Sequence, residues 1–323
     1  MAILWFGGED IDFPTFTGCF VNTTAGTFDA SYARAGISIG DGGAATSTQF
    51  PSGAVTSCWL RYYQGNQGFN NNKFLGLGSF GTAYKGLWVG SGTSDSKFAI
   101  WKYVTSWTKL AEESGNHFVS GIFIDLQLID YGATGTINVY ANGVLVVTYT
   151  GNLSVTGVSG FDCIMLGAYG TTNMNPVISE IIVADEDTRT MRLAKLVPTS
   201  DGTTTDMVGD YSAVDETTIN DADGNYTDTA GKDQQFNVSD LPAGTFAIKA
   251  VKIACRACKT VDASIGKLAL GYNSGGTVAV GADQTLTTAW ATYESLNNTN
   301  PVTGNAWLQS EMNALQLNVR SAT

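Results

Sequence analysis

Paired carboxylates are the residues of this chain whose types could do acid–base chemistry. A retaining glycosidase needs two carboxyl groups about 5–5.5 Å apart, one as nucleophile and one as general acid. A Glu-x-Asp-x-x-Glu spacing would present such a set along one strand. Glu180 is instead followed two residues later by Ile182, and Asp125 by Gln127. The acidic run 185–187 leaves a strand for a loop, where solvated charge is expected. The sequence therefore predicts no catalytic residues and no enzymatic activity.

Metal ligation is the second kind of chemistry to consider. His117 is the only histidine, so a multi-histidine site cannot form, and no GxSxG nucleophile motif accompanies it. The run from Asp221 to Asp228 carries oxygen ligands of the kind that calcium prefers. An EF-hand loop starting at Asp221 would need glycine at Tyr226 and glutamate at Lys232. Both positions are wrong, so a polar turn is the preferred interpretation, with no metal ligands assigned and no cofactor expected.

The five cysteines offer thiol chemistry. Their odd number argues against a complete set of internal disulfides. Cys255-Arg-Ala-Cys258 is formally a CxxC, but the sequence has no second CxxC and no helix signal follows it, which disfavours zinc and thioredoxin-type redox work. A disulfide that uses Cys255 and Cys258, within or between subunits, stays open. The other three, Cys19, Cys58 and Cys163, are expected to be buried free thiols.

Aromatic side chains could bind a sugar by stacking. Aromatic residues on strands more often pack in a core, so both interpretations stay open. Trp107, Tyr63 and Asn70 are the candidates for contact with a glycan or a protein partner, because Trp107 and the turn 65–72 look exposed. The aromatic residues that could form a sugar-stacking platform are Trp59, Trp88, Trp101, Trp107, Tyr62, Tyr63 and Tyr103.

The elements that must position these residues are β-strands. Within 118–151, apolar residues alternate with other residues at the period of a strand, first over 122–128 and then over 137–141. Asn142-Gly143 is a strong hairpin signal, because a type I′ turn needs positive φ at both positions. A third strand returns over 144–149. Three strands joined by tight turns predict an antiparallel sheet and an all-β fold.

Composition agrees with many short strands joined by polar turns. The chain has 323 residues, with 38 glycines against 6 prolines, and only 14% of its residues are charged. Its net charge of −12 makes a nucleic-acid partner unexpected, because phosphate contacts dominate such binding. No run of 18 apolar residues predicts a membrane span, so no membrane partner is expected either.

A length of 323 residues accommodates two domains. Strand patterns fill 1–197, with one or two helical turns expected over 187–196. The polar, turn-rich segment 198–209 is the expected linker. A smaller β-rich domain, 210–323, is expected to anchor or oligomerise the protein. Apolar residues at helical spacing within 305–317 predict one short C-terminal helix.

The hairpin string GTINVYANGVLVVTYTG, residues 135–151, resembles the laminin-G-like or concanavalin A-like jelly roll. A late strand such as ISEIIVA, residues 178–184, is also typical of that fold. The resemblance covers about 1–197 and implies a jelly-roll sandwich there. It also implies that a structural calcium ion could sit at the sheet rim, without indicating its ligands.

The wider pattern is similar to structural proteins of tailed bacteriophages. The segments that carry it are MAILWFGGEDIDF, SEIIVADEDTRTMRLAKLVPTSDG and AWLQSEMNALQLNVRS. This resemblance implies a non-enzymatic virion component (capsid decoration, head fibre or tail protein) that is made in the host cytoplasm. Its expected partners are other virion proteins and further copies of itself, as a homo-oligomer. The alternative is a glycan-binding adhesin module that contacts a cell-surface glycan of the host.

Overall fold

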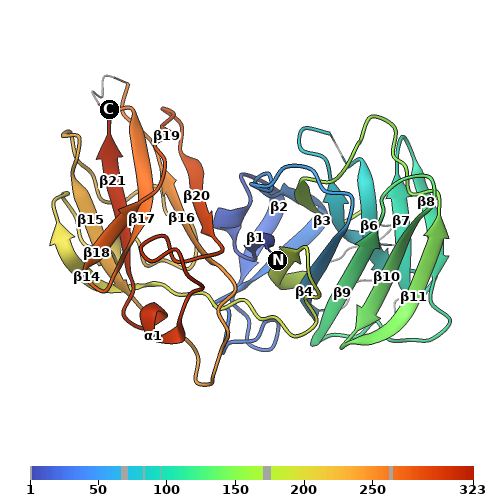
Figure 1. The fold of residues 1–323 in the computed structure, drawn as a ribbon. Helices are drawn as coiled ribbons and strands as arrows, with labels where there is room; N and C mark the ends of the chain where they lie inside the picture. Colours follow the sequence, from blue (N-terminus) through green and yellow to red (C-terminus); the bar gives the residue numbers. More distant parts are fainter. Residues whose placement is uncertain (1, 67–71, 83, 95, 170–175, 262–264) are drawn as a thin grey trace. The chain divides into compact units, whose positions relative to one another are not determined.

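The structure is a computed structural model that describes all residues except 1, 67–71, 83, 95, 170–175 and 262–264 (Figure 1). It divides into two compact units, Met1–Leu193 and Ala194–Thr323. Both units are built almost entirely of β-strands, so the predicted all-β class is confirmed. No helix in the described part of the chain is long and apolar enough to cross a membrane.

The first unit is a jelly-roll-like sandwich made from one continuous antiparallel sheet. The strand order is β11-β10-β9-β4-β13-β3-β12-β5-β6-β7-β8, with β1 added on β13 and β2 on β3. The sheet folds over so that β11, at one end, lies against β7 and β8, at the other (Figure 1). Its strands are β1 (Ile3–Gly7), β2 (Thr15–Asn22), β3 (Gly36–Thr46), β4 (Cys58–Asn66), β5 (Lys73–Gly78), β6 (Gly86–Ser91), β7 (Phe98–Tyr103), β8 (Trp107–Glu112), β9 (Ile122–Ile129), β10 (Gly135–Ala141), β11 (Val144–Gly151), β12 (Cys163–Gly167) and β13 (Val177–Ala184).

The core of this unit lies between the two folded halves of the sheet. It takes every second residue of the strands, as the alternation over 122–128 predicts. The hairpin turn is also as predicted: Ala141 pairs with Val144, and φ is 46° at Asn142 and 80° at Gly143. Each half of the sandwich therefore has a second face, turned away from the core, on which other residues gather.

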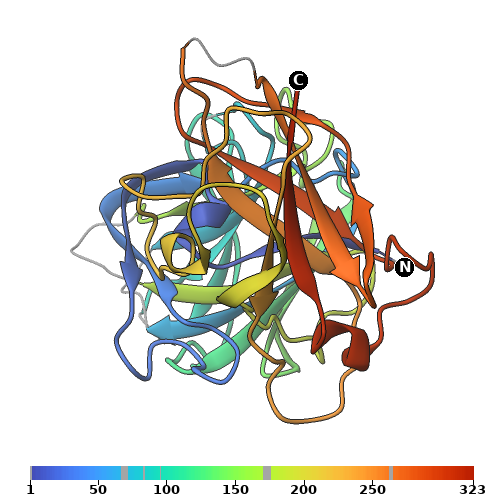
Figure 2. The same ribbon diagram turned by 90° about the vertical axis from the view of Figure 1, so that its left-hand side faces the viewer.

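The second unit is a smaller β-structure with its own core. Five strands follow the order β14-β15-β21-β17-β18, with β19 on β17, while β16 and β20 pair separately. In Figure 2, β21 (red) runs beside β17 (orange). Trp307 is buried in this core and donates from Nε1 to the Asn297 carbonyl at 3.0 Å. The elements are β14 (Pro198–Thr205), β15 (Asp233–Val238), β16 (Val251–Ala257), β17 (Lys267–Ser274), β18 (Thr277–Val280), β19 (Gln284–Thr285), β20 (Ala291–Asn297), α1 (Gln309–Met312) and β21 (Gln316–Ala322).

The junction between the units differs from the expected one. The division falls between Leu193 and Ala194, and the expected linker 198–209 begins with strand β14, which pairs with β15. β14 ends its sheet and exposes much of its length, so its polar composition is typical of an edge strand and was misinterpreted as a linker. The segment 187–196 forms turns and irregular chain, so the expected helical turns there are wrong. The short C-terminal helix exists as α1.

Candidate functional site

Glycines on one outer face of the sandwich make room for large rings. Gly76 on β5 pairs with Trp88 on β6, and a Cβ atom at Gly76 would lie 2.6 Å from the indole. The Trp88 ring therefore rests directly on the sheet backbone and is fully buried. Trp101 on β7 is the cross-strand neighbour of Trp88 and is 7% exposed. These two tryptophans form what we term the aromatic floor.

Four further rings lie over the aromatic floor and are open to solvent to different extents. We term Tyr84, Tyr103, Trp107 and Tyr169 the aromatic patch. Ring centroids are 4.5 Å apart for Tyr84 and Tyr169, 4.8 Å for Tyr103 and Trp107, and 5.6 Å for Trp107 and Tyr169. Trp107 also meets Trp88 edge-on at 5.5 Å. Tyr84 is 39% exposed and the other three are partly exposed, so the patch is a contiguous aromatic surface backed by the buried aromatic floor.

Two lysines border this surface. The Lys73 Nζ atom lies 4.2 Å from the centroid of Trp101 and 5.3 Å from that of Trp107. The Lys109 Nζ atom lies 5.8 Å from Trp101 and forms an ion pair with Glu112. Burial lowers the pKa of Lys73 from its ordinary value. Ammonium groups at these distances interact with the ring quadrupole, so the patch combines aromatic surface with positive charge.

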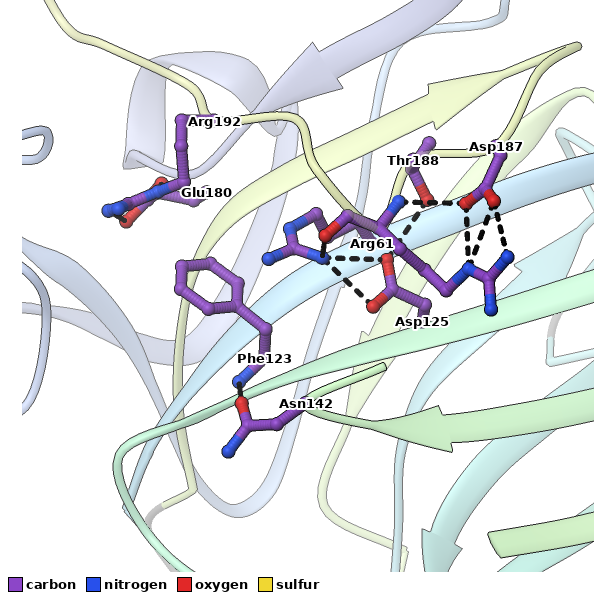
Figure 3. Close-up of polar contacts among 9 residues, drawn as sticks. Arg61, Phe123, Asp125, Asn142, Glu180, Asp187, Thr188 and Arg192 are labelled. Carbon is purple, nitrogen blue, oxygen red and sulfur yellow. Dashed lines mark hydrogen bonds and ion pairs between the residues drawn. The ribbon is translucent and has the colours of Figure 1, made fainter. Parts of the chain in front are cut away.

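The opposite outer face, over β4, β9 and β13, carries ion pairs (Figure 3). Arg61 and Asp125 are direct cross-strand partners, and the Arg61 Nη1 atom donates to both carboxylate oxygens at 2.9 and 3.0 Å. The Asp125 side chain is completely buried and that of Arg61 is 7% exposed. Thr188 donates to Asp125 at 3.1 Å. Burial raises the pKa of Asp125, and Arg61 opposes that rise.

A β-bulge places a second acid on this ionic face. The register of β13 against β4 shifts between Ser179 and Ile182, and Glu180 there has φ of 49°. Because Ile181 still points into the core, the extra residue turns Glu180 outward. Its carboxylate accepts from Arg192 at 2.8 and 2.9 Å, and Arg192 also reaches Asp29 at 2.7 Å. Burial raises the pKa of Glu180, and Arg192 opposes the rise.

The segment 185–193, which we term the strap, crosses the ionic face. The Arg189 carbonyl accepts from Arg61 at 2.8 Å, and the Arg189 guanidinium lies 5.2 Å from the Trp59 centroid and 4.8 Å from that of Tyr140. Phe123 has Arg61 at 4.0 Å and Arg192 at 4.8 Å from its ring centroid. The strap is thus held to the sheet by ion pairs, hydrogen bonds and cation–π contacts together.

The two buried acids are poorly placed to transfer protons. A general acid needs a carboxyl group that exchanges its proton with the substrate. In Asp125 both oxygens accept from Arg61, and in Glu180 both accept from Arg192. Each carboxylate is therefore committed to a guanidinium that also fixes the strap. The geometry of the ionic face favours a structural role.

The predicted contact residues do not form one site. Trp107 lies in the aromatic patch, whereas Tyr63 lies on the ionic face with its ring 5.2 Å from Phe123. Asn70 lies outside the described residues. Of the other predicted platform residues, Trp88, Trp101 and Tyr103 join Trp107, while Tyr62 is in the core and Trp59 is under the strap. Tyr84 and Tyr169 were missed because they stand outside the strands. The one sequence signal for them was the glycine-rich strands beside them.

The remaining candidates of the sequence analysis are explained by local contacts. Asp221 pairs with Arg256 at 2.6 Å, and Asp223 accepts from Asn220 at 3.0 Å. Across the described ranges, no group of three or more His, Cys, Asp or Glu residues is placed to hold a metal ion. His117 donates its backbone N–H to Glu113 at 3.0 Å, and its ring contacts the same carboxylate.

The two cysteines of the CxxC are not joined to each other. Cys255 and Cys258 are both free thiols. Cys255 packs against the core of the second unit, and burial raises its pKa to about 12. Cys258 lies beyond the end of β16, and its pKa is raised mainly by burial. A raised pKa keeps a thiol protonated, which disfavours nucleophilic chemistry by this pair.

Comparisons with known proteins add no family. No family model matches the chain, and no curated protein matches it. Among solved structures, similar folds include the binding domain of Paraclostridial Mosquitocidal Protein 1, with 9% identity and a TM-score of 0.38 over 57% of this chain and 49% of that one. The chain thus spans about half the length of that domain. The globular domain of T. cruzi calreticulin matches with 11% identity and a TM-score of 0.38, over 58% of this chain and 89% of that one.

The binding domain of botulinum neurotoxin serotype D/C is also similar, with 12% identity and a TM-score of 0.36 over 91% of this chain and 92% of that one. Two of these three structures are of binding domains. All three of these TM-scores are below 0.5, so the argument for function rests on the two outer faces described above.

Proposed function

We propose that this chain is a non-catalytic binding protein whose sandwich recognises a saccharide on the aromatic patch. The observation that carries the proposal is the set of four mutually contacting, partly exposed rings backed by two buried tryptophans. The C–H faces of a sugar ring pack well on aromatic rings, while its hydroxyl groups stay hydrated at the margin. Tyr and Trp provide such a surface with little loss of side-chain entropy on binding.

Substitution within the patch tests this proposal directly. Trp107→Ala and Tyr103→Ala should each weaken binding at least about ten-fold on a glycan array, in line with a stacking contact of about 1.4 kcal/mol. Tyr226→Ala is the matched control, because Tyr226 is 66% exposed in the second unit and is not in the patch. Equal loss in the control, or no loss in the patch variants, would count against the patch as the binding site.

We further propose that the sandwich has no hydrolytic activity. The support is that both oxygens of Asp125 and of Glu180 are engaged by arginines. Incubation with a broad panel of bacterial polysaccharides should release no reducing ends. Reproducible cleavage that disappears in Glu180→Gln would refute this, provided that the variant unfolds at the same temperature as the native chain.

A virion role is the second candidate, and it is compatible with saccharide binding. Its support is the resemblance of the opening, middle and closing segments of the sequence to tailed-phage structural proteins. On this proposal the second unit anchors the chain in the particle by protein–protein contacts, either as a single copy or as a homo-oligomer. Density-gradient-purified particles should contain the full chain, and a chain ending at Leu193 should fail to incorporate. Incorporation of the shortened chain at the native level would rule out the second unit as the anchor.

A further inference from the structure

The turn between β10 and β11 contains a chemically reactive pair of residues. Asn142-Gly143 is the only asparagine–glycine pair in the chain, and both residues are exposed. The backbone nitrogen that follows an asparagine can attack the side-chain amide, and glycine has no side chain to hinder that approach. Nothing lies within 4 Å of the position where Gly143 would carry a Cβ atom. Neither steric hindrance nor burial therefore protects this pair from water.

The native conformation of the turn nevertheless disfavours the reaction. The Phe123 N–H donates to the Asn142 Oδ1 atom at 3.0 Å (Figure 3), and the Asn142 N–H donates to the Phe123 carbonyl at 2.8 Å. A type I′ turn has ψ of about 30° at its first central residue, which is Asn142 here. This ψ keeps the Gly143 nitrogen away from the Asn142 Cβ atom, whereas ring closure needs these two atoms side by side. The turn must therefore open before the nitrogen can reach Cγ.

We propose that Asn142 is a deamidation site and that opening of the hairpin turn controls its reaction. In the open turn the Gly143 nitrogen loses its proton to solvent and attacks the Asn142 Cγ atom. The bond from this nitrogen to Cγ forms, the bond from Cγ to Nδ2 breaks, and Nδ2 takes up a proton and leaves as ammonia. Water then opens the succinimide ring. Cleavage between the nitrogen and Cγ gives aspartate, and cleavage between the nitrogen and the backbone carbonyl carbon gives isoaspartate.

The two products differ in whether the hairpin can close again. Aspartate tolerates positive φ and keeps a carboxylate oxygen that can accept from the Phe123 N–H. In isoaspartate the chain passes through Cβ, so the turn gains a backbone carbon. Ala141 and Val144 pair directly across a two-residue turn, and the register of a hairpin depends on the length of its turn. The isoaspartate form should therefore keep the ends of β10 and β11 apart. This inference is independent of the proposed saccharide binding.

The test follows residue 142 by peptide mass spectrometry while the full chain ages in warm, mildly alkaline buffer. One sample is folded, and the other is unfolded in guanidinium chloride. Enzymatic methylation of isoaspartate distinguishes that product from aspartate. The unfolded chain should react at Asn142 at least about ten-fold faster, as expected if opening of the turn costs about 1.4 kcal/mol. Asn152, which is exposed and followed by leucine, is the internal control and should react far more slowly in both samples.

Variants and the purified product test the structural consequence. Asn142→Gly keeps the turn and removes the side-chain amide, so it should form no succinimide at this position. Asn142→Asp supplies the aspartate product and should unfold at the same temperature as the native chain. The isolated isoaspartate form should unfold at a lower temperature. Its backbone amides over 141–145 should exchange hydrogen at least about ten-fold faster than those of the native chain.

Each part of the proposal has its own contrary result. An intact Asn142 in the aged, unfolded chain overturns the modification site. Equal reaction rates in the folded and unfolded samples overturn control by the turn. An isoaspartate form with the unfolding temperature and hydrogen exchange of the native chain overturns the loss of hairpin pairing.

Discussion

The two outer faces of the N-terminal sandwich use the same sheet in opposite ways. On the face of β5 to β8, glycines leave room for rings, and the outermost of these rings remain open to solvent. On the face of β4, β9 and β13, arginines hold two buried acids and a covering strap (Figure 3). Both faces contain aromatic residues and cations. On the ionic face, arginines are bound to two buried carboxylates, whereas on the other face Lys73 and Lys109 approach the ring of Trp101.

This difference separates a face that is complete from one that can accept a ligand. The carboxylates of Asp125 and Glu180 accept hydrogen bonds from Arg61 and Arg192, so these two guanidinium groups have little capacity left to bind a partner. At the aromatic patch, ring faces can still gain by contact with another molecule. Burial of polar groups is costly unless they are paired. Removal of one residue of the ionic face should therefore lower the stability of the protein far more than removal of one residue of the aromatic face.

The largest expected effect is at the buried ion pair. Asp125→Ala leaves Arg61 buried without its carboxylate and should lower the free energy of unfolding by about 3–5 kcal/mol, measured by denaturant titration. The double variant Arg61→Met with Asp125→Leu removes both charges and should recover most of the loss. If the single variant costs less than about 1 kcal/mol, the ionic face is not the interdependent network described here.

The close packing of Trp88 on Gly76 should show the next largest effect. Gly76→Ala would place a methyl group 2.6 Å from the Trp88 ring, and overpacking of this kind costs about 1–3 kcal/mol. It should also reduce glycan binding, because the patch rests on Trp88. Gly132→Ala is the control, since the nearest atom to its Cβ would be 3.9 Å away. Thermal unfolding of the two variants side by side measures the difference.

The hairpin turn beside the ionic face is expected to contribute less. Asn142 has positive φ, and its Oδ1 atom accepts from the Phe123 N–H at 3.0 Å. Alanine resists positive φ and cannot accept this hydrogen bond, so Asn142→Ala should destabilise the unit by about 1 kcal/mol. Asn142→Gly keeps the backbone conformation and loses only the hydrogen bond, so it should lie between the native chain and the alanine variant. The same loss in both variants would show that backbone strain is unimportant here.

The smallest effect concerns pH and the exposed end of the ionic face. Burial acts to raise the pKa of Asp29, but hydrogen bonds from Arg192 and Ser31 outweigh it, so the pKa lies below its ordinary value. A carboxyl with a lowered folded pKa stabilises the protein above its unfolded pKa of about 3.9, and this is lost as the pH falls through the folded value. Asp29→Asn should flatten that acid loss by less than about 1 kcal/mol, because the pair is part-exposed. If Asp29→Asn leaves the acid unfolding curve unchanged, Asp29 does not contribute to the loss of stability at acid pH.

The structural features that could be predicted from the sequence are those that depend on residues close together along the chain. Alternation over 122–128 and the Asn142-Gly143 turn identify three strands and their pairing, because period and turn chemistry are local properties. The ionic face was not predictable in this way. Arg61, Asp125 and Thr188 are far apart in sequence, and the direction of Glu180 depends on a bulge that leaves no residue pattern of its own.

The aromatic patch was partly predictable from the sequence. Trp107 and Tyr63 were both predicted as contact candidates, Trp107 because it looked exposed. The structure places Tyr63 on the other face. Alternation tells which residues of one strand share a side, but the strand order decides which strands meet. Polar composition misled in the same way at 198–205, where an edge strand has the residues of a linker.

The strap also determines how the sandwich would respond to mechanical tension. The chain passes from the first unit to the second only once, immediately after Leu193. The Leu193 N–H donates to Glu180 at 3.4 Å, and the adjacent Arg192 grips Glu180 and Asp29. A pull on the second unit would therefore reach these contacts before any strand of the sheet. The strap would detach first, while the rows of backbone hydrogen bonds between strands stay intact.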